Sequence, residues 1–550
     1  MSQTSEVIKS NKMPSAIPYI VGNEAAERFN YYGLRAILVT FLVAHFYNPS
    51  KDPNLMQVAE ATANAKTHDF VAMCYLLPMF GGMIADWFWG KYKTILYLSI
   101  VYAIGNLCLA AFVSNESMFL SALMLIAVGA GGIKPCVSAN VGDQFDETNS
   151  HLITKAFNAF YASINAGSLL SILLIPYLNS HYGPQVAFGV PAIAMIIATM
   201  FFYAGRNKYV RKPPKGDDNK KVIFLTAFGT LVISYLVFDR FSKDIFGENF
   251  QGGTGPLLGG WGLMILAVAM IFKKQWFAKP GNFVGISLYA LFNGGFKNAE
   301  KEYGEKSIDG IRSVWRVLAV FAFVPFFWAL WDQSQSEWVI QAKKCDLNLG
   351  FWGLKWEAEQ LSAVNAAFIL ILIPVFNLGI FPLVKRLGIA VTPMRKIGAG
   401  LVLTALSFVV IAYIQEPIDV LVAQCKASGV TYDSLADTVK PSIYWQAFAF
   451  FILTAGEVLV SITCLEYAYT QSPPSMKSTI MACYLLSVTF GNVLVSVIQN
   501  NIKAGGFFAR FEGAKFFWLF TGICAVTAVV FMIVSPRISE KNYIDSVEPE

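Results

Sequence analysis

The chain has 550 residues, of which 55% are hydrophobic and only 14% are charged. Soluble domains carry about 25% charged residues, so this composition excludes a soluble globular protein. The net charge of +6 is too small to indicate binding to nucleic acid. A transmembrane helix needs roughly 20 apolar residues, and the chain has room for a dozen or more of them. We therefore expect an all-α integral membrane protein that lies in a lipid bilayer.

Apolar runs long enough to cross a bilayer fall into three groups along the chain. The first group has six runs, near 20–46, 68–88, 94–114, 118–141, 156–179 and 185–205. The second group has two runs, near 222–238 and 256–272, and the shorter stretch 281–296 that follows is predicted to be interfacial. The third group has six runs, near 314–340, 358–384, 397–415, 443–468, 478–501 and 514–535. The sequence thus predicts about 14 transmembrane helices, arranged as six, two and six.

Lysine and arginine residues in the short connections predict the orientation of these helices. The connection 206–221 holds seven of them, whereas the connections 113–117 and 179–183 hold none. Both termini are therefore expected in the cytoplasm. The predicted organisation is a tail, a six-helix bundle, a connecting region with the two additional helices, a second six-helix bundle and a second tail, at 1–19, 20–205, 206–313, 314–536 and 537–550. Transporters built from two repeat halves show this pattern, with the substrate site between the halves.

Ionisable side chains inside the apolar runs are the most informative residues, because each costs at least ~2.5 kcal/mol at the bilayer centre. In the first run, spacings of three, four, seven and eleven residues place five polar side chains on one helix face: Glu24, Glu27, Arg28, Tyr31 and Arg35. Later runs contain His68, Lys134, Asp332 and Glu457. The carboxylates in this set outnumber the lysine and arginine side chains by one, which predicts a protonatable site. Structural ion pairs are the alternative, but the spread of these residues over several runs favours a polar cavity.

The uncharged polar residues of the apolar runs each allow two interpretations. The tyrosines of the apolar runs could line a cavity or anchor the helices at the interface, and the asparagines could bind a ligand or join helices: Tyr31, Tyr32, Tyr75, Tyr161, Asn165 and Asn365. The motif GAGGIK lacks the spacing of a phosphate-binding loop, and no C-x-x-C pair exists, so neither nucleotide hydrolysis nor a metal site is expected. A disulfide between Cys345 and Cys425, in polar connections, is left open.

Seven motifs follow one another along the chain. The first, EAAERFNYYG at 24–33, matches the pattern E-x-x-E-R-F-x-Y-Y-G, and the others lie at 81–95, 129–145, 160–169, 328–333, 393–400 and 456–478. Together these motifs resemble the proton-dependent oligopeptide transporters of the major facilitator superfamily. The resemblance implies a major facilitator fold of two six-helix bundles, with two additional central helices as in the bacterial members.

The resemblance also implies a function. It suggests a symporter in the bacterial inner membrane that imports di- and tripeptides with protons by alternating access. Such a protein is not an enzyme, needs no cofactor because the proton gradient drives it, and is expected to be a monomer. A receptor for a zwitterionic peptide needs a cationic patch for the carboxylate, an acid for the ammonium and a roomy wall for the side chains.

Roles for individual residues follow from the same resemblance. Arg28 and Lys134 would face the peptide carboxylate, and Glu457 with Asn165 and Asn365 would hold the amino end. The other residues of the binding pocket would be Tyr31, Tyr32, Arg35, Tyr75, Tyr161 and Ser461. Proton coupling would involve Glu24, Glu27, Arg28 and His68. The gates would involve Arg35, His68, Lys134, Asp332 and Glu457.

One position departs from the family pattern. Many members continue after the aspartate of the seventh main span as Q-x-G-S-R-W, whereas this chain has Glu337 where that arginine stands. The exchange alters the local charge by two units and puts the pairing at the outer gate in doubt. Three other functions stay open. They are a transporter of nitrate or another small anion with the same fold, a peptide sensor that moves nothing, and a membrane-embedded enzyme, for which His68 is the only well-placed histidine.

Overall fold

The computed structural model describes residues 12–47, 53–146, 148–214, 283–348, 355–471 and 477–538. Eleven helices in these ranges are long and apolar enough to cross a membrane. Helix α1, Ile17–Leu42, is long enough as well, although it carries several ionisable side chains. The two additional helices predicted at 222–238 and 256–272 lie outside the described residues, as do most of the two tails. Within the described ranges the chain forms helices and two isolated β-bridges, with no strand.

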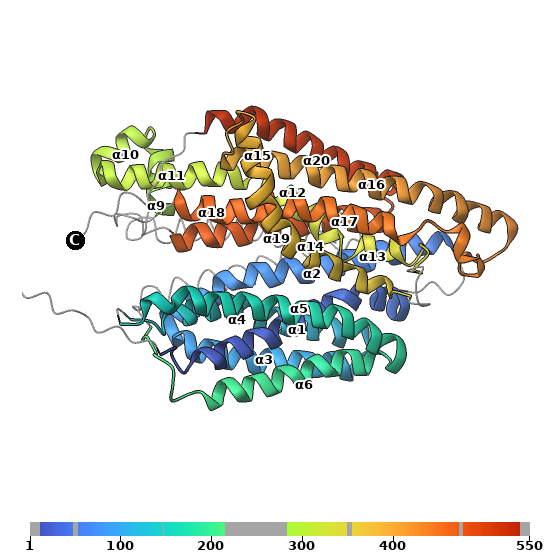
Figure 1. The fold of residues 1–550 in the computed structure, drawn as a ribbon, viewed down its shortest axis with the longest axis horizontal. Helices are drawn as coiled ribbons and strands as arrows, with labels where there is room; N and C mark the ends of the chain where they lie inside the picture. The colour runs from blue at the N-terminus through green and yellow to red at the C-terminus, as the bar shows by residue number, and fades with distance from the viewer. Residues whose placement is uncertain are drawn as a thin grey trace, which may run out of the picture. The chain divides into compact units, whose positions relative to one another are not determined.

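The helices group into two compact units (Figure 1). Unit 1 comprises residues 1–50, 73–224 and 356–366. Its helices pack chiefly as the pairs α1 with α5, α1 with α6, α3 with α4 and α3 with α6. Besides α1, its elements are η1 (Val43–Tyr47), the second half of α2 (Pro53–Ile84), η2 (Ala85–Trp89), α3 (Lys91–Ala111), α4 (Glu116–Gly142), α5 (Ile153–Tyr182), α6 (Pro184–Ala204) and η4 (Ala358–Ser362).

Unit 2 comprises residues 51–72, 225–355 and 367–550. Its helices pack chiefly as the pairs α16 with α20, α16 with α17 and α12 with α19. Its elements are the first half of α2, α9 (Phe283–Phe292), α10 (Phe296–Tyr303), α11 (Glu305–Phe321), α12 (Val324–Gln333), α13 (Glu337–Ala342), most of α14 (Ala363–Pro374), η5 (Val375–Ile380), α15 (Phe381–Arg386), α16 (Pro393–Ser428), α17 (Ile443–Glu457), η8 (Val458–Ile462), α18 (Thr463–Thr470), α19 (Lys477–Lys503) and α20 (Ala514–Val534).

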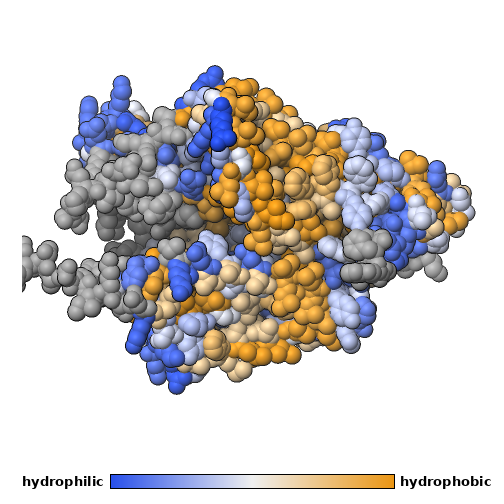
Figure 2. Space-filling model, in the orientation of Figure 1, coloured by the Kyte–Doolittle hydropathy of each residue, from blue (hydrophilic) through white to orange (hydrophobic). Residues whose placement is uncertain are grey.

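Local sequence signals explain where several helices begin and end. The side chain of Asn115 accepts a hydrogen bond from the backbone N–H of Met118 and caps the start of α4. Thr392 caps α16 in the same way, and Gly429, with a φ of 67°, ends it in the left-handed conformation that glycine adopts readily. Beyond the first turn of α20, the exposed side chains are apolar, as expected of a lipid-facing surface, and include Val526, Val529, Val530, Met532 and Ile533. Figure 2 shows hydrophobic residues gathered along the middle of the helices and hydrophilic ones toward their ends.

Three predicted boundaries are wrong. Helix α2 begins at Pro53 rather than near 68, because residues 53–67 are polar yet form a helix that packs within unit 2. Helix α16 continues to Ser428, well beyond the predicted end at 415, because a helix can extend past its apolar run. The run predicted at 314–340 is broken into α11, α12 and α13. The irregular backbone after Gln333 is buried in protein, which is where a membrane protein tolerates such a break. The stretch predicted to be interfacial forms α9, whose 10 residues are too few to span a bilayer.

Candidate functional site

The polar face of α1 is built around the guanidinium of Arg28. Its Nε lies 2.7 Å from Oε1 of Glu24, one helical turn away, and 3.2 Å from Oε2 of Glu27. Both glutamates are almost completely buried, with exposed fractions of 1% for Glu24 and 0% for Glu27. One cation therefore serves two buried acids. Such an arrangement is sensitive to any ligand that competes for the cation, because buried charges need partners.

Lys134 of α4 lies against the same face. Its Nζ is 3.8 Å from the ring centroid of Tyr31 and 4.5 Å from that of Tyr75, so two aromatic rings hold the ammonium by cation–π contacts. Within the part of the chain that the structure describes, this nitrogen has no hydrogen-bond partner. Three donor positions of a buried ammonium are thus available to an anion.

Glycines of the GAGGIK motif bring Lys134 to this position. A Cβ added to Gly129 would lie 2.8 Å from the backbone nitrogen of Tyr102 in α3, and one added to Gly131 would lie 2.6 Å from Cβ of Leu77 in α2. No side chain fits at either contact. These glycines therefore let α4 pack closely against α3 and α2.

The remaining polar residues of α1 extend the cluster. Tyr32 packs edge-on against Tyr31, with ring centroids 5.4 Å apart. Arg35 is 2% exposed, and its Cζ lies 6.0 Å from the centroid of Tyr31. Unit 1 therefore brings together most of the predicted site residues of the first half: Glu24, Glu27, Arg28, Tyr31, Tyr32, Arg35, Tyr75 and Lys134.

Helix α5 carries two further predicted site residues. Tyr161 is 61% exposed, and the amide nitrogen of Asn165 donates a hydrogen bond to the carbonyl oxygen of Tyr161 one turn earlier. Asn365 lies in the first turn of α14 and belongs to unit 1, whereas Glu457 belongs to unit 2. The predicted grouping of these amides with Glu457 stays a prediction.

Glu457 is the last residue of α17, directly before the π-helical turn η8. The indole Nε1 of Trp331 in α12 donates a hydrogen bond of 2.8 Å to its Oε2. One turn on, the hydroxyl of Ser461 lies 3.0 Å from the hydroxyl of Tyr484 in α19. Sequence reasoning singled out neither Trp331 nor Tyr484. The signal for Trp331 was present, because its motif, WALWDQ, places an N–H donor in an apolar run that also holds Asp332.

His68 and Asp332 lie in one hydrogen-bonded chain. The Nδ1 of His68 is 2.7 Å from Oδ1 of Asn492, whose amide nitrogen donates to Oδ2 of Asp332 at 2.6 Å. The other ring nitrogen of His68 is 3.0 Å from the hydroxyl of Ser336, at the break between α12 and α13. All four side chains are buried. Asn492 and Ser336 were missed, although an amide in the apolar run of α19 was a usable signal.

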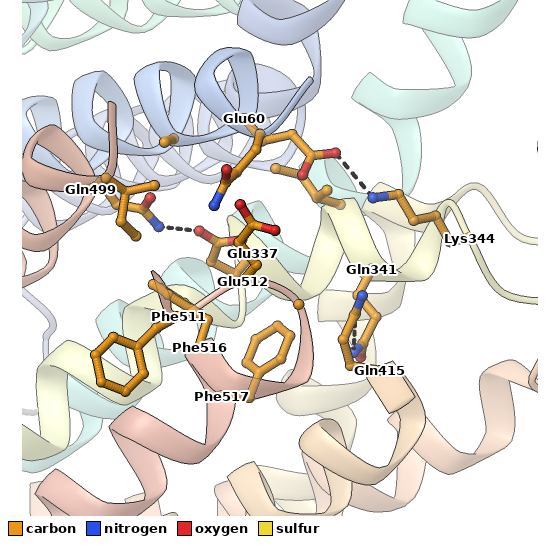
Figure 3. Close-up of a pocket in the computed structure, with 15 residues that line it drawn as sticks. Glu60, Glu337, Gln341, Lys344, Gln415, Gln499, Phe511, Glu512, Phe516 and Phe517 are labelled. Carbon is orange, nitrogen blue, oxygen red and sulfur yellow. Dashed lines mark hydrogen bonds and ion pairs between the residues drawn. The ribbon is translucent and has the colours of Figure 1, made fainter. Parts of the chain in front are cut away.

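Glu337, the residue that departs from the family pattern, lines a cavity of about 80 Å³ in unit 2, which we call the α2–α13 pocket. Its carboxylate accepts a hydrogen bond from the amide of Gln499, and nearby Nζ of Lys344 is 3.1 Å from Oε1 of Glu60 in α2 (Figure 3). Burial lowers the pKa of Lys344, but Glu60 and Glu337 outweigh burial and leave it above its ordinary value. Lys344 therefore stays charged at neutral pH.

A second charged cluster closes the end of unit 1 where α4 finishes. Asp143 accepts hydrogen bonds from Lys91, at 2.6 Å, and from Lys212, at 2.8 Å. Gln144 next to it exchanges hydrogen bonds with the backbone of Val210. Burial alone would raise the pKa of Asp143, but the two lysines hold it below its ordinary value. The segment that follows α6 is thereby fastened to the ends of α3 and α4.

The disulfide that the sequence left open is not formed in the structure. Cys345 and Cys425 are both buried free thiols, and burial raises the pKa of Cys345 to about 12. A thiol with so high a pKa carries almost no thiolate at neutral pH.

Comparison with known proteins agrees with the family resemblance of the seven sequence motifs. A family model described as the POT family, PTR2, matches residues 92–515. The chain belongs to the POT family. It is 34% identical over 421 residues to solute carrier family 15 member 2 of Danio rerio, and the match covers 74% of this chain and 50% of that relative. The chain thus spans about half the length of the curated relatives it matches.

Two solved structures of POT family proteins extend the likeness to nearly the whole chain. An auto-inhibited POT family peptide transporter superimposes with a TM-score of 0.78 at 31% identity, covering 98% of this chain and 99% of the other. A proton-dependent oligopeptide (POT) family transporter superimposes with a TM-score of 0.70 at 36% identity, covering 94% and 100%. These likenesses confirm the predicted all-α, multi-pass membrane fold of the major facilitator type. The names of these proteins are those of transporters.

Proposed function

We propose that this POT family protein is a proton-coupled symporter that imports di- and tripeptides by alternating access. The observation that carries the proposal is the polar face of unit 1, where Arg28 is shared by Glu24 and Glu27, and Lys134 presents a buried ammonium. An anion bound at this face would interact with two cations, Arg28 and Lys134. The peptide transporters among its relatives support the choice of a peptide carboxylate as that anion.

The other end of the substrate needs an acid. We assign the peptide ammonium to Glu457, a carboxylate inside a membrane-spanning helix of unit 2. Asn165 and Asn365 are proposed to help at the amino end, and Tyr31, Tyr32, Arg35, Tyr75, Tyr161 and Ser461 to contact the rest of the peptide. Charge complementarity at both ends of a zwitterion would give specificity without reading the side chains.

Proton coupling follows from the sharing of Arg28. When a peptide carboxylate draws the guanidinium away, one of the two glutamates loses its counter-charge and becomes easier to protonate. Substrate and proton would then favour each other's binding, which is the linkage that symport requires. No cofactor is needed, because the proton gradient supplies the free energy.

Alternating access also needs contacts that exist in one state only. We propose that the chain of hydrogen bonds from His68 to Asp332, together with Arg35, closes the outer side. The pattern of basic connections favours cytoplasmic termini, and the resemblance to bacterial members favours a bacterial inner membrane. We expect the transporter to act as a monomer.

Accumulation of a radiolabelled dipeptide in liposomes tests the function. The reconstituted protein should concentrate dialanine when the outside is acidic, and unlabelled tripeptide should compete whereas nitrate should not. Competition by nitrate alone would establish the anion transporter, and binding of dialanine without accumulation would establish a sensor.

A double variant tests the coupling site. Glu24→Gln Glu27→Gln, which mimics permanent protonation, should exchange dipeptide for dipeptide across the membrane but should not concentrate it with a pH gradient. The control Glu116→Gln, at an exposed carboxylate of α4 that bonds to Tyr47, should accumulate peptide normally. Wild-type accumulation by the double variant would remove these two glutamates from the coupling mechanism.

A further inference from the structure

The contact between Trp331 and Glu457 joins α12 to α17 inside unit 2. The indole Nε1 lies 2.8 Å from Oε2 of the glutamate, and Trp331 is only 7% exposed. A hydrogen bond to an ionised acceptor is shorter and stronger than one between neutral groups. The indole N–H therefore fixes one oxygen of the carboxylate in place.

The backbone around Glu457 has little freedom to move. A Cβ added to the preceding residue, Gly456, would lie 2.8 Å from Oγ1 of Thr404 and 2.9 Å from the carbonyl oxygen of Gly400, both in α16. Helices α16 and α17 thus meet backbone to backbone at this level. This close crossing fixes the backbone position of Glu457. Only the side-chain torsions of Glu457 then remain free to vary.

The indole of Trp331 is held as firmly. It packs edge-on against Trp328, with centroids 5.5 Å apart, and Trp328 packs in turn against Tyr484 of α19. A Cβ added to Gly491 of α19 would lie 2.6 Å from the carbonyl oxygen of Pro325 in α12, so these two helices are also in close contact. The donor is consequently a rigid group that does not need to be ordered when a substrate arrives.

A carboxylate has about four acceptor positions, so the same group can accept an indole N–H and an ammonium N–H together. A side chain whose rotamer is already fixed loses less conformational entropy on binding, which increases affinity. We propose that Trp331 is a positioning residue that holds the Glu457 carboxylate ready for the peptide ammonium and so sets the preference for substrates with a free amino terminus. The inference rests on the proposed role of Glu457 in peptide transport.

The test compares two substrates in one variant. Trp331→Phe removes the N–H and keeps most of the ring. It should weaken binding of dialanine about tenfold, the factor expected for loss of a hydrogen bond to a charged group, and binding of N-acetyl-dialanine no more than about twofold. Inhibition constants against a reporter dipeptide in liposomes give both numbers.

Trp328→Phe is the matched control. It is a tryptophan on the same helix, in the same aromatic cluster, whose indole N–H has no hydrogen-bond partner among the described residues. It should change both inhibition constants by the same factor. If the Trp331 variant folds poorly, benzothienylalanine at position 331, which has the shape of tryptophan with sulfur in place of N–H, should give the same selective loss.

The Glu457→Gln background separates this inference from the function on which it rests. If Trp331 acts through Glu457, adding Trp331→Phe to Glu457→Gln should leave the ratio of the two inhibition constants unchanged. A selective loss in Glu457→Gln but an equal loss for both substrates in Trp331→Phe would overturn the positioning role alone. An equal loss in Glu457→Gln itself would remove Glu457 from the amino site, and the role of Trp331 would fall with it.

Discussion

The imidazole of His68 and the amide of Asn492 are hydrogen-bonded at 2.7 Å, although 424 positions separate them in the chain. The same amide donates to Asp332, so one side chain connects a histidine of α2 with an aspartate of α12. A second hydrogen bond joins the same two helices, because the hydroxyl of Ser496 in α19 donates to the carboxylate of Asp69 in α2. Two adjacent residues of α2 thus bind side chains that lie one turn apart on α19.

Breaking this link should shift the transport equilibrium. Asn492→Ala leaves His68 and Asp332 without the shared amide, and the loss of a buried hydrogen bond, about 1 kcal/mol, should raise the ratio of outward-open to outward-closed molecules about fivefold. Distance distributions between spin labels on the two halves would measure it. Asn106→Ala is the control, because Asn106 is a buried amide of α3 that donates to the carbonyl oxygen of Tyr102 within its own helix. An unchanged distribution would indicate a static structural contact.

The close crossing of α4 with α3 makes a steric prediction. Gly129→Ala places a methyl group 2.8 Å from the backbone of Tyr102 and should destabilise the protein by about 1–3 kcal/mol, while displacing Lys134 from its rings. At Gly142, in the last turn of the same helix, an added Cβ meets nothing within 4 Å, so Gly142→Ala should be neutral or slightly stabilising. Thermal unfolding in detergent would compare the two. Equal melting temperatures would contradict the packing argument.

Asp143 predicts a dependence of stability on pH. Its pKa is held below the ordinary value, so its contribution to stability is present above the unfolded pKa, about 4, and is lost as the pH falls through the lower folded value. Asp143→Asn should therefore melt at a lower temperature than the wild type at pH 7, and the difference should shrink as the pH falls below about 4, toward the lower folded pKa. The control Asp146→Asn removes the charge of a carboxylate that accepts hydrogen bonds from Thr148 and forms no ion pair with a lysine among the described residues, and it should have the smaller effect. A difference that did not shrink as the pH fell below about 4 would show that the lysines are not the cause.

The ion pair of the α2–α13 pocket can be tested by exchanging its charges. Lys344→Gln removes the cation that is paired with Glu60 and should reduce stability by about 1–2 kcal/mol, a value discounted for partial exposure. The charge exchange Glu60→Lys Lys344→Glu should recover most of the loss. The exposed pair of Lys355 with Asp437 is the control, since Lys355→Gln should change stability much less than Lys344→Gln. Failure of the charge exchange to rescue would show that Glu60 is not the partner that matters.

Spacing along the sequence was sufficient to predict the polar face of α1, because residues three and four positions apart necessarily share a helix face. The fold class followed from composition, and the twelve main spans followed from hydropathy. The start of α2 did not, since its first turns are polar and only tertiary packing reveals that they form part of the helix.

Partners across helices were also beyond reach. Nothing in the sequence connects Asn492 to His68, or Trp331 to Glu457, because these contacts depend on how distant helices are aligned along their length. At Glu337, too, the sequence showed the residue but not its partner. The exchange of charge was visible in the motif, but its acceptance of an amide hydrogen bond from Gln499 depends on the register of α19.

Helix α2 has a mechanical consequence. It is one continuous helix of 32 residues, yet residues up to Ala72 belong to unit 2 and residues from Met73 onward belong to unit 1. Pro78 stands a few residues beyond this boundary and removes one backbone hydrogen bond, which locally softens a helix. A helix bends most easily where its hydrogen bonding is weakest. Any bending of α2, the helix that both units share, is therefore expected near Pro78.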